Sequence, residues 1–390
     1  MPSPSSVFRY LENFHDEEEE TLREEGKAFI PRPNGHLRGL VLVNKDMVAS
    51  VQRHDPKNSA TLDMDATILE TSKNGAAYCY KGFKAYQPMN VYWGEQGLVL
   101  HTEFRDGNVP AGYEQLRVLI ESLEILPEGV EKVRLRSDTA GYQHDLMRYC
   151  EMGKSERFGR IEFAIGCDVS KEFKEAAGEA RESEWQPIYR EVNGKRVKTG
   201  REWAEVCFVP SAIAHSKKDP EYRYLAIREV LEQPELIDGA GQRELPFAAM
   251  TMHKRAYKVS GIVTNMDWSA QELIYWHYER CGKSEEAHSV MKEDFAGSRM
   301  PSGDFGENAA WWWVMVLAMN LNSAMKRLVL GGEWTQKRMK SIRYGLINLP
   351  ARVCFHAREL SVRLSSGHPS FELLVNARAR IAQLAHPPSG

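Results

Sequence analysis

The sequence predicts an α/β protein whose mixed sheet is flanked by helices, and the order of its patterned segments is the main evidence. Residues 91–104 (VYWGEQGLVLHTEF) have the pattern of a β-hairpin. Residues 113–126 place apolar side chains at helical spacing. A short strand at 133–138, a helix at 144–151 and a strand at 161–169 follow. A hairpin followed by alternating helices and strands is typical of a mixed sheet covered by helices.

The remaining segments complete this organisation. Residues 170–258 are richer in Trp, Tyr and β-branched residues, which favours a β-rich insertion. The S-A-Q-E sequence at 269–272 is a capping box that opens a long helix, and a second helix covers 308–330. The predicted division is 1–58, an N-terminal segment; 59–169, the first part of the core; 170–258, the insertion; 259–330, the second part of the core; and 331–390, a basic C-terminal region of helical character.

Composition excludes several classes of protein. The chain has 390 residues, of which 42% are hydrophobic and 27% charged, as in ordinary globular proteins. It contains no apolar run long enough to cross a membrane, and its N-terminus lacks a signal-peptide core. The six cysteines are far apart and form no CxxC pair. This argues against a zinc knuckle or a disulfide framework and favours a reducing cytoplasm.

Charge is unevenly distributed along the chain. The net charge is −3, which does not indicate a nucleic-acid binder as a whole. Residues 326–380, however, contain eleven Lys or Arg against three Glu, a net charge of +8. Such a region can neutralise phosphates locally. A solvated helical surface explains the same charge, and charge alone leaves both interpretations open.

Three acidic residues stand apart from ordinary surface charge. Asp65 ends the apolar run in LDMDAT, and Asp63 lies two residues earlier, on the same face of the predicted strand. Asp138 ends the strand VRLRSD, at the edge where open α/β sheets place their sites. Glu285 lies inside the predicted long helix. Each residue also has a structural explanation. Asp65 could belong to a turn, Asp138 could be a helix N-cap, and Glu285 could lie on a solvated helix surface.

Taken together, the three carboxylates point to metal-dependent phosphoryl transfer. Two Mg²⁺ ions can activate an attacking oxygen and stabilise a leaving oxygen. Mg²⁺ prefers oxygen ligands, and two or three carboxylates from separate elements suffice to hold it. The sequence shows no His cluster, and this chemistry requires none.

The long helix offers further candidate residues. Tyr278, Glu285 and Lys292 are seven residues apart, which is nearly two turns, so they share one helix face. That face supplies a metal ligand, a cation for a phosphate and an aromatic ring. The same spacing also occurs in helices where Tyr and Lys simply border the apolar residues that pack against a neighbouring helix. Trp268 and the run 311–313 could stack on an unpaired base, with core packing expected for most of the three-Trp run.

These motifs resemble those of the DDE transposases of bacterial insertion sequences. The family's signature on its last catalytic helix is Tyr-x2-Arg-x3-Glu-x6-Lys, and YERCGKSEEAHSVMK supplies its Tyr, Glu and Lys at that spacing. Cys281 takes the Arg position, with Arg280 adjacent. LDMDAT and RSDTAGY are similar to the two Asp strands. The resemblance implies an RNase H-like core interrupted by a β-strand insertion, and it makes residues 1–58 the remnant of an N-terminal region.

The resemblance also implies an activity and a set of site residues. The activity is metal-dependent cleavage and transfer of DNA strands at the ends of an insertion sequence. The implied partners are double-stranded DNA and a second copy of the chain, in the cytoplasm and at the nucleoid, with two Mg²⁺ ions that Mn²⁺ can replace. The implied catalytic residues and metal ligands are Asp65, Asp138 and Glu285, with Asp63 as a weaker candidate ligand. The implied DNA-binding residues are Tyr278, Arg280, Lys292 and Trp268.

Two alternatives remain open at this stage. An RNase H-like nuclease would use the same carboxylates to hydrolyse DNA without strand transfer. A catalytically impaired or truncated copy would act only as a DNA-binding or dimerising inhibitor, which the Cys281 substitution and the short N-terminal region both permit.

Overall fold

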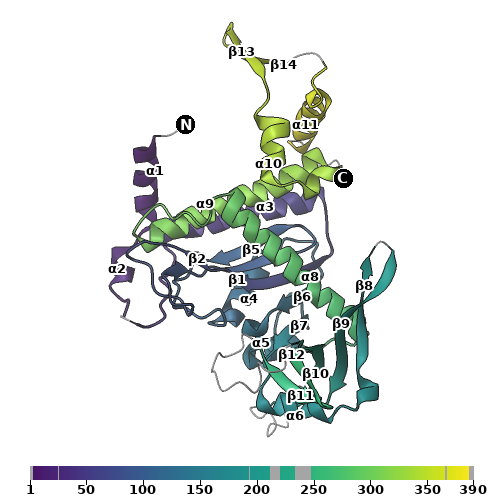
Figure 1. The fold of residues 1–390 in the computed structure, drawn as a ribbon. Coiled ribbons are helices and arrows are strands. Elements are labelled where there is room, and N and C mark those ends of the chain that lie inside the picture. Colours follow the sequence, from purple (N-terminus) through teal and green to yellow (C-terminus); the bar gives the residue numbers. More distant parts are fainter. Residues whose placement is uncertain are drawn as a thin grey trace.

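The computed structural model describes residues 3–24, 26–192, 194–210, 220–232, 247–364 and 367–385, without the side chains of 281–285. One large sheet dominates the described part of the chain, and helices pack on both of its faces (Figure 1). Its strand order is β5-β4-β1-β6-β7-β12-β10-β9-β8, with β11 paired to β12.

The first half of this sheet is the predicted mixed sheet. β1 pairs antiparallel with β4, and β4 pairs antiparallel with β5. On its other side β1 pairs parallel with β6, and β6 pairs parallel with β7. This arrangement confirms the α/β, RNase H-like expectation. The five strands are β1 (Ser59–Ala66), β4 (Met89–Trp93), β5 (Leu98–Glu103), β6 (Lys132–Ser137) and β7 (Glu162–Cys167).

The β-rich insertion extends the same sheet. β12 pairs antiparallel with β7 and carries β10, β9 and β8 outward in turn. β12 also runs across the division expected at residue 258. The strands are β8 (Gln186–Val192), β9 (Lys195–Val206), β10 (Arg223–Val230), β11 (Ala249–Met252) and β12 (Arg255–Thr264). A separate pair joins β2 (Leu69–Glu70) to β3 (Ala85–Tyr86).

The alternation of side chains in β1 separates the core from the candidate site. Leu62 and Met64 belong to the main hydrophobic core, together with residues of α4, α5 and α6. Asp63 and Asp65 point to the opposite face, where α8 covers the strands. The longer helices are α3 (Gly35–His54), α4 (Gln115–Ile125), α5 (His144–Glu151), α6 (Lys171–Glu179), α8 (Ala270–Ser289) and α9 (Phe305–Ala324).

Shorter helical segments join and flank these elements. π-helical turns directly continue both α8 and α9. The short α-helices are α1 (Pro4–Leu11), α2 (Glu17–Glu20) and α10 (Met339–Ile342). The 3₁₀ segments are η1 (Glu12–Phe14), η2 (Thr139–Gly141), η3 (Glu182–Glu184) and η6 (Gly332–Gln336). The π segments are η4 (Val290–Asp294), η5 (Met325–Leu330) and η7 (Arg343–Ile347).

The N-terminal segment contributes α3, which the sequence did not predict. Asn34 caps this helix by accepting a hydrogen bond from the Leu37 N–H. Asn44 is fully buried and donates to the carbonyls of Val99 and Leu100 in β5. Two of the four buried residues of α3 are polar, so no apolar stripe marks the helix in the sequence.

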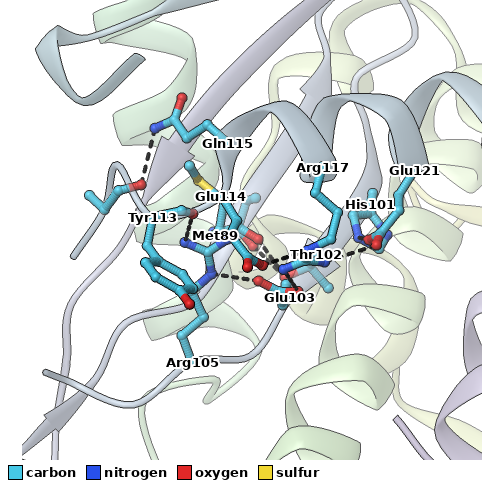
Figure 2. Close-up of polar contacts among 12 residues, drawn as sticks. Met89, His101, Thr102, Glu103, Arg105, Tyr113, Glu114, Gln115, Arg117 and Glu121 are labelled. Carbon is cyan, nitrogen blue, oxygen red and sulfur yellow. Dashed lines mark hydrogen bonds and ion pairs between the residues drawn. The ribbon is translucent and has the colours of Figure 1, made fainter. Parts of the chain in front are cut away.

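Ion pairs attach α4 to the neighbouring β5 (Figure 2). Arg117 reaches Glu103 at the end of β5 at 2.6 Å, and it also pairs with Glu114 and Glu121 at 2.7 and 2.8 Å. Arg105 approaches the other oxygen of Glu103 at 2.6 Å. The network orients the helix that packs beneath the two Asp-bearing strands.

The C-terminal region is helical in part but also contains a hairpin that the sequence did not predict. β13 (Ala351–His356) pairs antiparallel with β14 (Glu359–Leu364), and α11 (Phe371–Leu384) follows. The hairpin projects away from the sheet (Figure 1). Its turn places Ala357 and Arg358 at φ of 52° and 67°. Such turns are usually recognised by Asn-Gly or Asp-Gly, so Ala-Arg gives no turn signal.

Candidate active site

Asp65 and Asp138 lie together at one edge of the sheet. β1 and β6 are parallel, and Met64 partners Ser137, so the next residue of each strand is an aspartate. Asp138 caps η2, and its Oδ1 accepts a hydrogen bond from the Ala140 N–H at 3.0 Å. Burial raises the pKa of Asp138, and the negative charge of Asp65 raises it further. The edge therefore concentrates negative charge.

α8 brings a cation to this pair of carboxylates. Arg280 is only 7% exposed, and its Nη1 donates to Oδ2 of Asp65 at 3.2 Å. The Nδ1 atom of His288 lies 4.0 Å from the same oxygen. Arg280 was expected to contact DNA, but the structure places it against the candidate metal ligand. Its charge also lowers the pKa of Asp138, against the larger effect of burial.

Glu285 lies on α8 between Arg280 and His288. Its backbone position is described, but its side chain is outside the described residues. The same holds for Cys281, which takes the Arg position of the signature. Elsewhere in the described side chains, no three His, Cys, Asp or Glu residues gather as metal ligands would. Since both flanking residues reach Asp65, this stretch of α8 passes over the paired aspartates.

Two hydrogen bonds fix α8 to β6 one turn before Arg280. Nη1 of Arg136 donates to the carbonyl of Trp276 at 2.5 Å, and the guanidinium lies 4.9 Å from the centre of that residue's ring. Nε2 of His277 donates to the carbonyl of Ser137 at 3.0 Å. Arg136 and Ser137 directly precede Asp138 in the sequence. Their contacts therefore set the position of α8 relative to the strand ends.

Asp63 supports the same attachment. Its two oxygens accept from Nε and Nη2 of Arg136 at 2.6 and 2.8 Å, and both side chains are buried. The ion pair neutralises the charge of Asp63 and orients the arginine that reaches α8. This arrangement favours a structural role for Asp63 over metal ligation.

His277 is held as a neutral imidazole. A carbonyl can only accept, so the hydrogen bond to Ser137 places the proton on Nε2. Nδ1 has no hydrogen-bond partner in the described part of the chain. Burial lowers the pKa of His277 to about 4, and the nearby charges of Arg280 and Arg136 lower it further. A second proton would therefore be both buried and unpaired.

A buried chain of polar groups supports the site from the α9 side. Asn90 is the partner of Asp65 in the pairing of β1 with β4. Nε1 of Trp312 donates to Oγ1 of Thr102 at 2.8 Å, and that hydroxyl donates to Oδ1 of Asn90 at 2.7 Å. Nδ2 of Asn90 lies 3.5 Å from Nε2 of His288. No local sequence pattern marks these hydrogen-bonded residues, because their contacts depend on strand register.

The other predicted DNA-contacting residues lie before, within and after α8. Lys292, in η4, is close enough to Asp65 for that charge to raise its pKa, although burial has the larger effect and lowers it. Tyr278 faces the insertion, where Arg201 lies 5.7 Å from the centre of its ring. Trp268 packs edge-on against Trp276 and beneath Arg134. Of the three, only Lys292 lies close to the paired aspartates.

The described groups fit a divalent metal site. Two carboxylates from adjacent strands supply the oxygen ligands that Mg²⁺ and Mn²⁺ take. Their mutual repulsion and partial burial, expressed in the raised pKa of Asp138, would be relieved by a bound cation. In the described part of the chain, Arg280 supplies part of that compensation.

Comparison with known proteins identifies a family. Residues 2–386 match the family described as transposase DDE domain group 1. The chain belongs to this transposase family. Among solved structures, this family member is similar to a piggyBac transposase, seen by cryo-electron microscopy in a synaptic complex with hairpin DNA. The identity is 8%, the match covers 87% of this chain and 76% of that one, and the TM-score is 0.37. No curated protein sequence matches the chain.

One further property of this family member concerns membranes. Within the described ranges, none of the helices combines the length and the apolar character that a membrane span requires.

Proposed function

We propose that this family member cleaves DNA strands and joins them to a target, as a metal-dependent polynucleotidyl transferase. Asp65, Asp138 and Glu285 are the proposed catalytic residues and metal ligands. The observation that supports this most directly is the position of the two aspartates at adjoining ends of parallel strands, beneath the helix that carries Glu285.

The chain's own residues would perform distinct tasks. Asp65 and Asp138, with Glu285, would hold Mg²⁺ or Mn²⁺. When bound, two such ions supply activation of the attacking oxygen and stabilisation of the leaving oxygen. Lys292, half-buried beside Asp65, would bind a phosphate oxygen of the strand being cut. Arg280 would keep the site ordered by partly neutralising Asp65 until metal and DNA bind.

Other parts of the proposal extend along the chain. Tyr278 and Trp268 would contact DNA beyond the cut, on the side of the insertion. We infer that the chain divides near residues 58, 169 and 330, with the boundary expected at 258 falling inside β12, and that it acts as a homodimer on double-stranded DNA at insertion-sequence ends. The place of action would be the cytoplasm, at the nucleoid.

The test is strand cleavage of a plasmid that carries the DNA flanking this gene. Asp65→Asn and Asp138→Asn should each abolish nicking in Mg²⁺ while leaving DNA binding intact. Asp267→Asn, at an exposed carboxylate near the start of α8, is the matched control and should nick normally. Wild-type-level nicking by either active-site variant would remove the triad from the mechanism.

A second measurement separates strand transfer from simple hydrolysis. A pre-cleaved end is supplied together with target DNA, and joined product is sought on a gel. Joined product is expected. Nicking without joining would identify an RNase H-like nuclease, and DNA binding without either reaction would identify an inhibitory copy.

A further inference from the structure

The segment 337–364, here called the basic arm, carries much of the positive charge of the C-terminal region. It contains seven Lys or Arg and one Glu, on a chain whose net charge is −3. It comprises α10, η7 and the hairpin of β13 and β14. The hairpin projects from the body of the molecule (Figure 1), so its side chains are available to a large partner.

The register of the hairpin separates its side chains into two faces. One face is entirely apolar, and the other carries Arg352 directly opposite Arg363. Arg358 lies in the turn. Like charges placed directly opposite each other destabilise a strand pair, unless an anion lies between them. The apolar face consists of Ala351, Val353, Phe355, Leu360, Val362 and Leu364.

The three arginines are open to an external anion. All three are exposed, and none has an ion-pair partner among the described residues. By contrast, Arg338 at the base of the arm is paired with Asp294 at 2.8 Å. The positive charge at the tip of the arm therefore has no internal counter-ion in the described structure.

The base of the arm is attached to the segment that follows the catalytic helix. Asp294 is the last residue of η4 and accepts from Nε of Arg338 and from the Met339 N–H. Lys292, the proposed phosphate contact, lies two residues before Asp294. A DNA strand bound at the candidate site could therefore also meet the positive charge of the basic arm.

We propose that the basic arm contacts the phosphate backbone of duplex DNA through Arg352, Arg358 and Arg363, away from the scissile phosphate. This rests on the proposed function in taking DNA as the partner. A two-stranded ribbon has the width that the major groove of B-DNA admits. A second copy of the chain is disfavoured as the occupant of the arginine face, because two copies meeting on that face would bring the same arginines together; the apolar face lies on the opposite side of the ribbon. The apolar face stabilises the ribbon through its cross-strand pairs.

The test is the salt dependence of binding to a long, mixed-sequence, fluorescein-labelled duplex, measured by anisotropy without divalent cations. Each lost phosphate contact lowers the slope of log Kobs against log salt by about 0.9. Arg352→Gln with Arg363→Gln should therefore make the slope shallower by about 2. Arg352→Lys with Arg363→Lys keeps the charge and should restore the wild-type slope.

The matched control places the same loss of charge on α3. Arg38→Gln with Arg53→Gln changes two exposed arginines of that helix and should leave the slope unchanged. A shallower slope in the control as well would overturn the proposal, because net charge alone would then explain the effect.

The other outcomes separate this inference from the proposed function. If the wild-type chain binds the duplex and the Gln variant has its slope, the arm proposal is overturned and DNA binding stands. If the wild-type chain does not bind the duplex, both fail. A Gln variant with the wild-type slope but a changed molecular mass in light scattering would assign the hairpin to a second copy, and would also overturn the proposal.

Discussion

Arg280 donates a hydrogen bond from Nη1 to Oδ2 of Asp65 at 3.2 Å, so a positive charge from α8 lies against a carboxylate of β1. The pair is partly buried, where two charges interact more strongly than in bulk water. The guanidinium of Arg280 compensates the negative charge of Asp65. It also competes with any cation that Asp65 would bind.

The first prediction follows from this competition. Arg280→Gln removes a positive charge beside the proposed ligands and should tighten Mn²⁺ binding about tenfold, or by about 1.4 kcal/mol. Isothermal titration calorimetry measures the change. Arg181→Gln, at an exposed ion pair on η3, is the control and should bind Mn²⁺ like the wild type. Weaker Mn²⁺ binding by the Arg280 variant would show that the arginine assembles the site instead.

A second prediction distinguishes the two aspartates of β1. Asp63→Asn removes the buried carboxylate that pairs with Arg136 and leaves the guanidinium, among the described residues, only its longer ion pair with the exposed Glu279, at 3.7 Å, which should cost about 3–5 kcal/mol of unfolding free energy. Mn²⁺ affinity should change little. Asp65→Asn should do the reverse, abolishing Mn²⁺ binding with little loss of stability.

Urea unfolding and calorimetry of both variants check this assignment. The two substitutions are chemically identical and lie two residues apart on one strand face, so each serves as the control for the other. Loss of Mn²⁺ binding in the Asp63 variant at unchanged stability would return that residue to the ligand set.

The sequence predicted the parts of the fold that depend on local pattern. The alternating strands, the N-cap at Ser269 and the strand-end position of Asp138 are all present in the structure. The meeting of Asp65 with Asp138 was also predictable, because parallel strands end at the same edge. Motif spacing led to Glu285, whose side chain lies outside the described residues.

The parts that were missed depend on long-range contacts. α3 packs through buried Asn44 as well as apolar residues, so its periodicity is weak. The tight turn after β13 uses Ala357 and Arg358 at positive φ, without the residues that normally mark such turns. The attachment of His277 to Ser137 joins residues 140 positions apart, and no local pattern encodes that distance.

A third prediction concerns the Trp run of α9. Trp312→Phe removes the indole N–H that reaches Thr102 and leaves a small cavity in a fully buried site. The expected cost is about 1–3 kcal/mol of unfolding free energy. Trp311→Phe is the matched control, because Nε1 of Trp311 has no partner within the described chain. Equal losses in urea unfolding would show that the hydrogen bond to Thr102 contributes nothing.

The last prediction concerns the pH dependence of stability that His277 confers. Its folded-state pKa is about 4, because burial and then neighbouring arginines disfavour the charged ring, whereas an unfolded His titrates near 6.5. Between these values the unfolded chain binds more protons, so unfolding free energy falls as pH falls from about 6.5 towards about 4. Above about 6.5 this effect is absent.

His277→Gln isolates this contribution, because an amide can still donate to the Ser137 carbonyl but does not titrate. The buried ring of His288 also has a pKa lowered to about 4, and it is present in both proteins, so its effect cancels in the difference. Between pH 7 and pH 5 the wild type should lose on the order of 2 kcal/mol of unfolding free energy relative to the variant. Urea unfolding at the two pH values measures this difference. Parallel pH profiles for the two proteins would mean that the folded and unfolded chains protonate His277 at the same pH, and the neutral hydrogen bond that positions α8 would have to be abandoned.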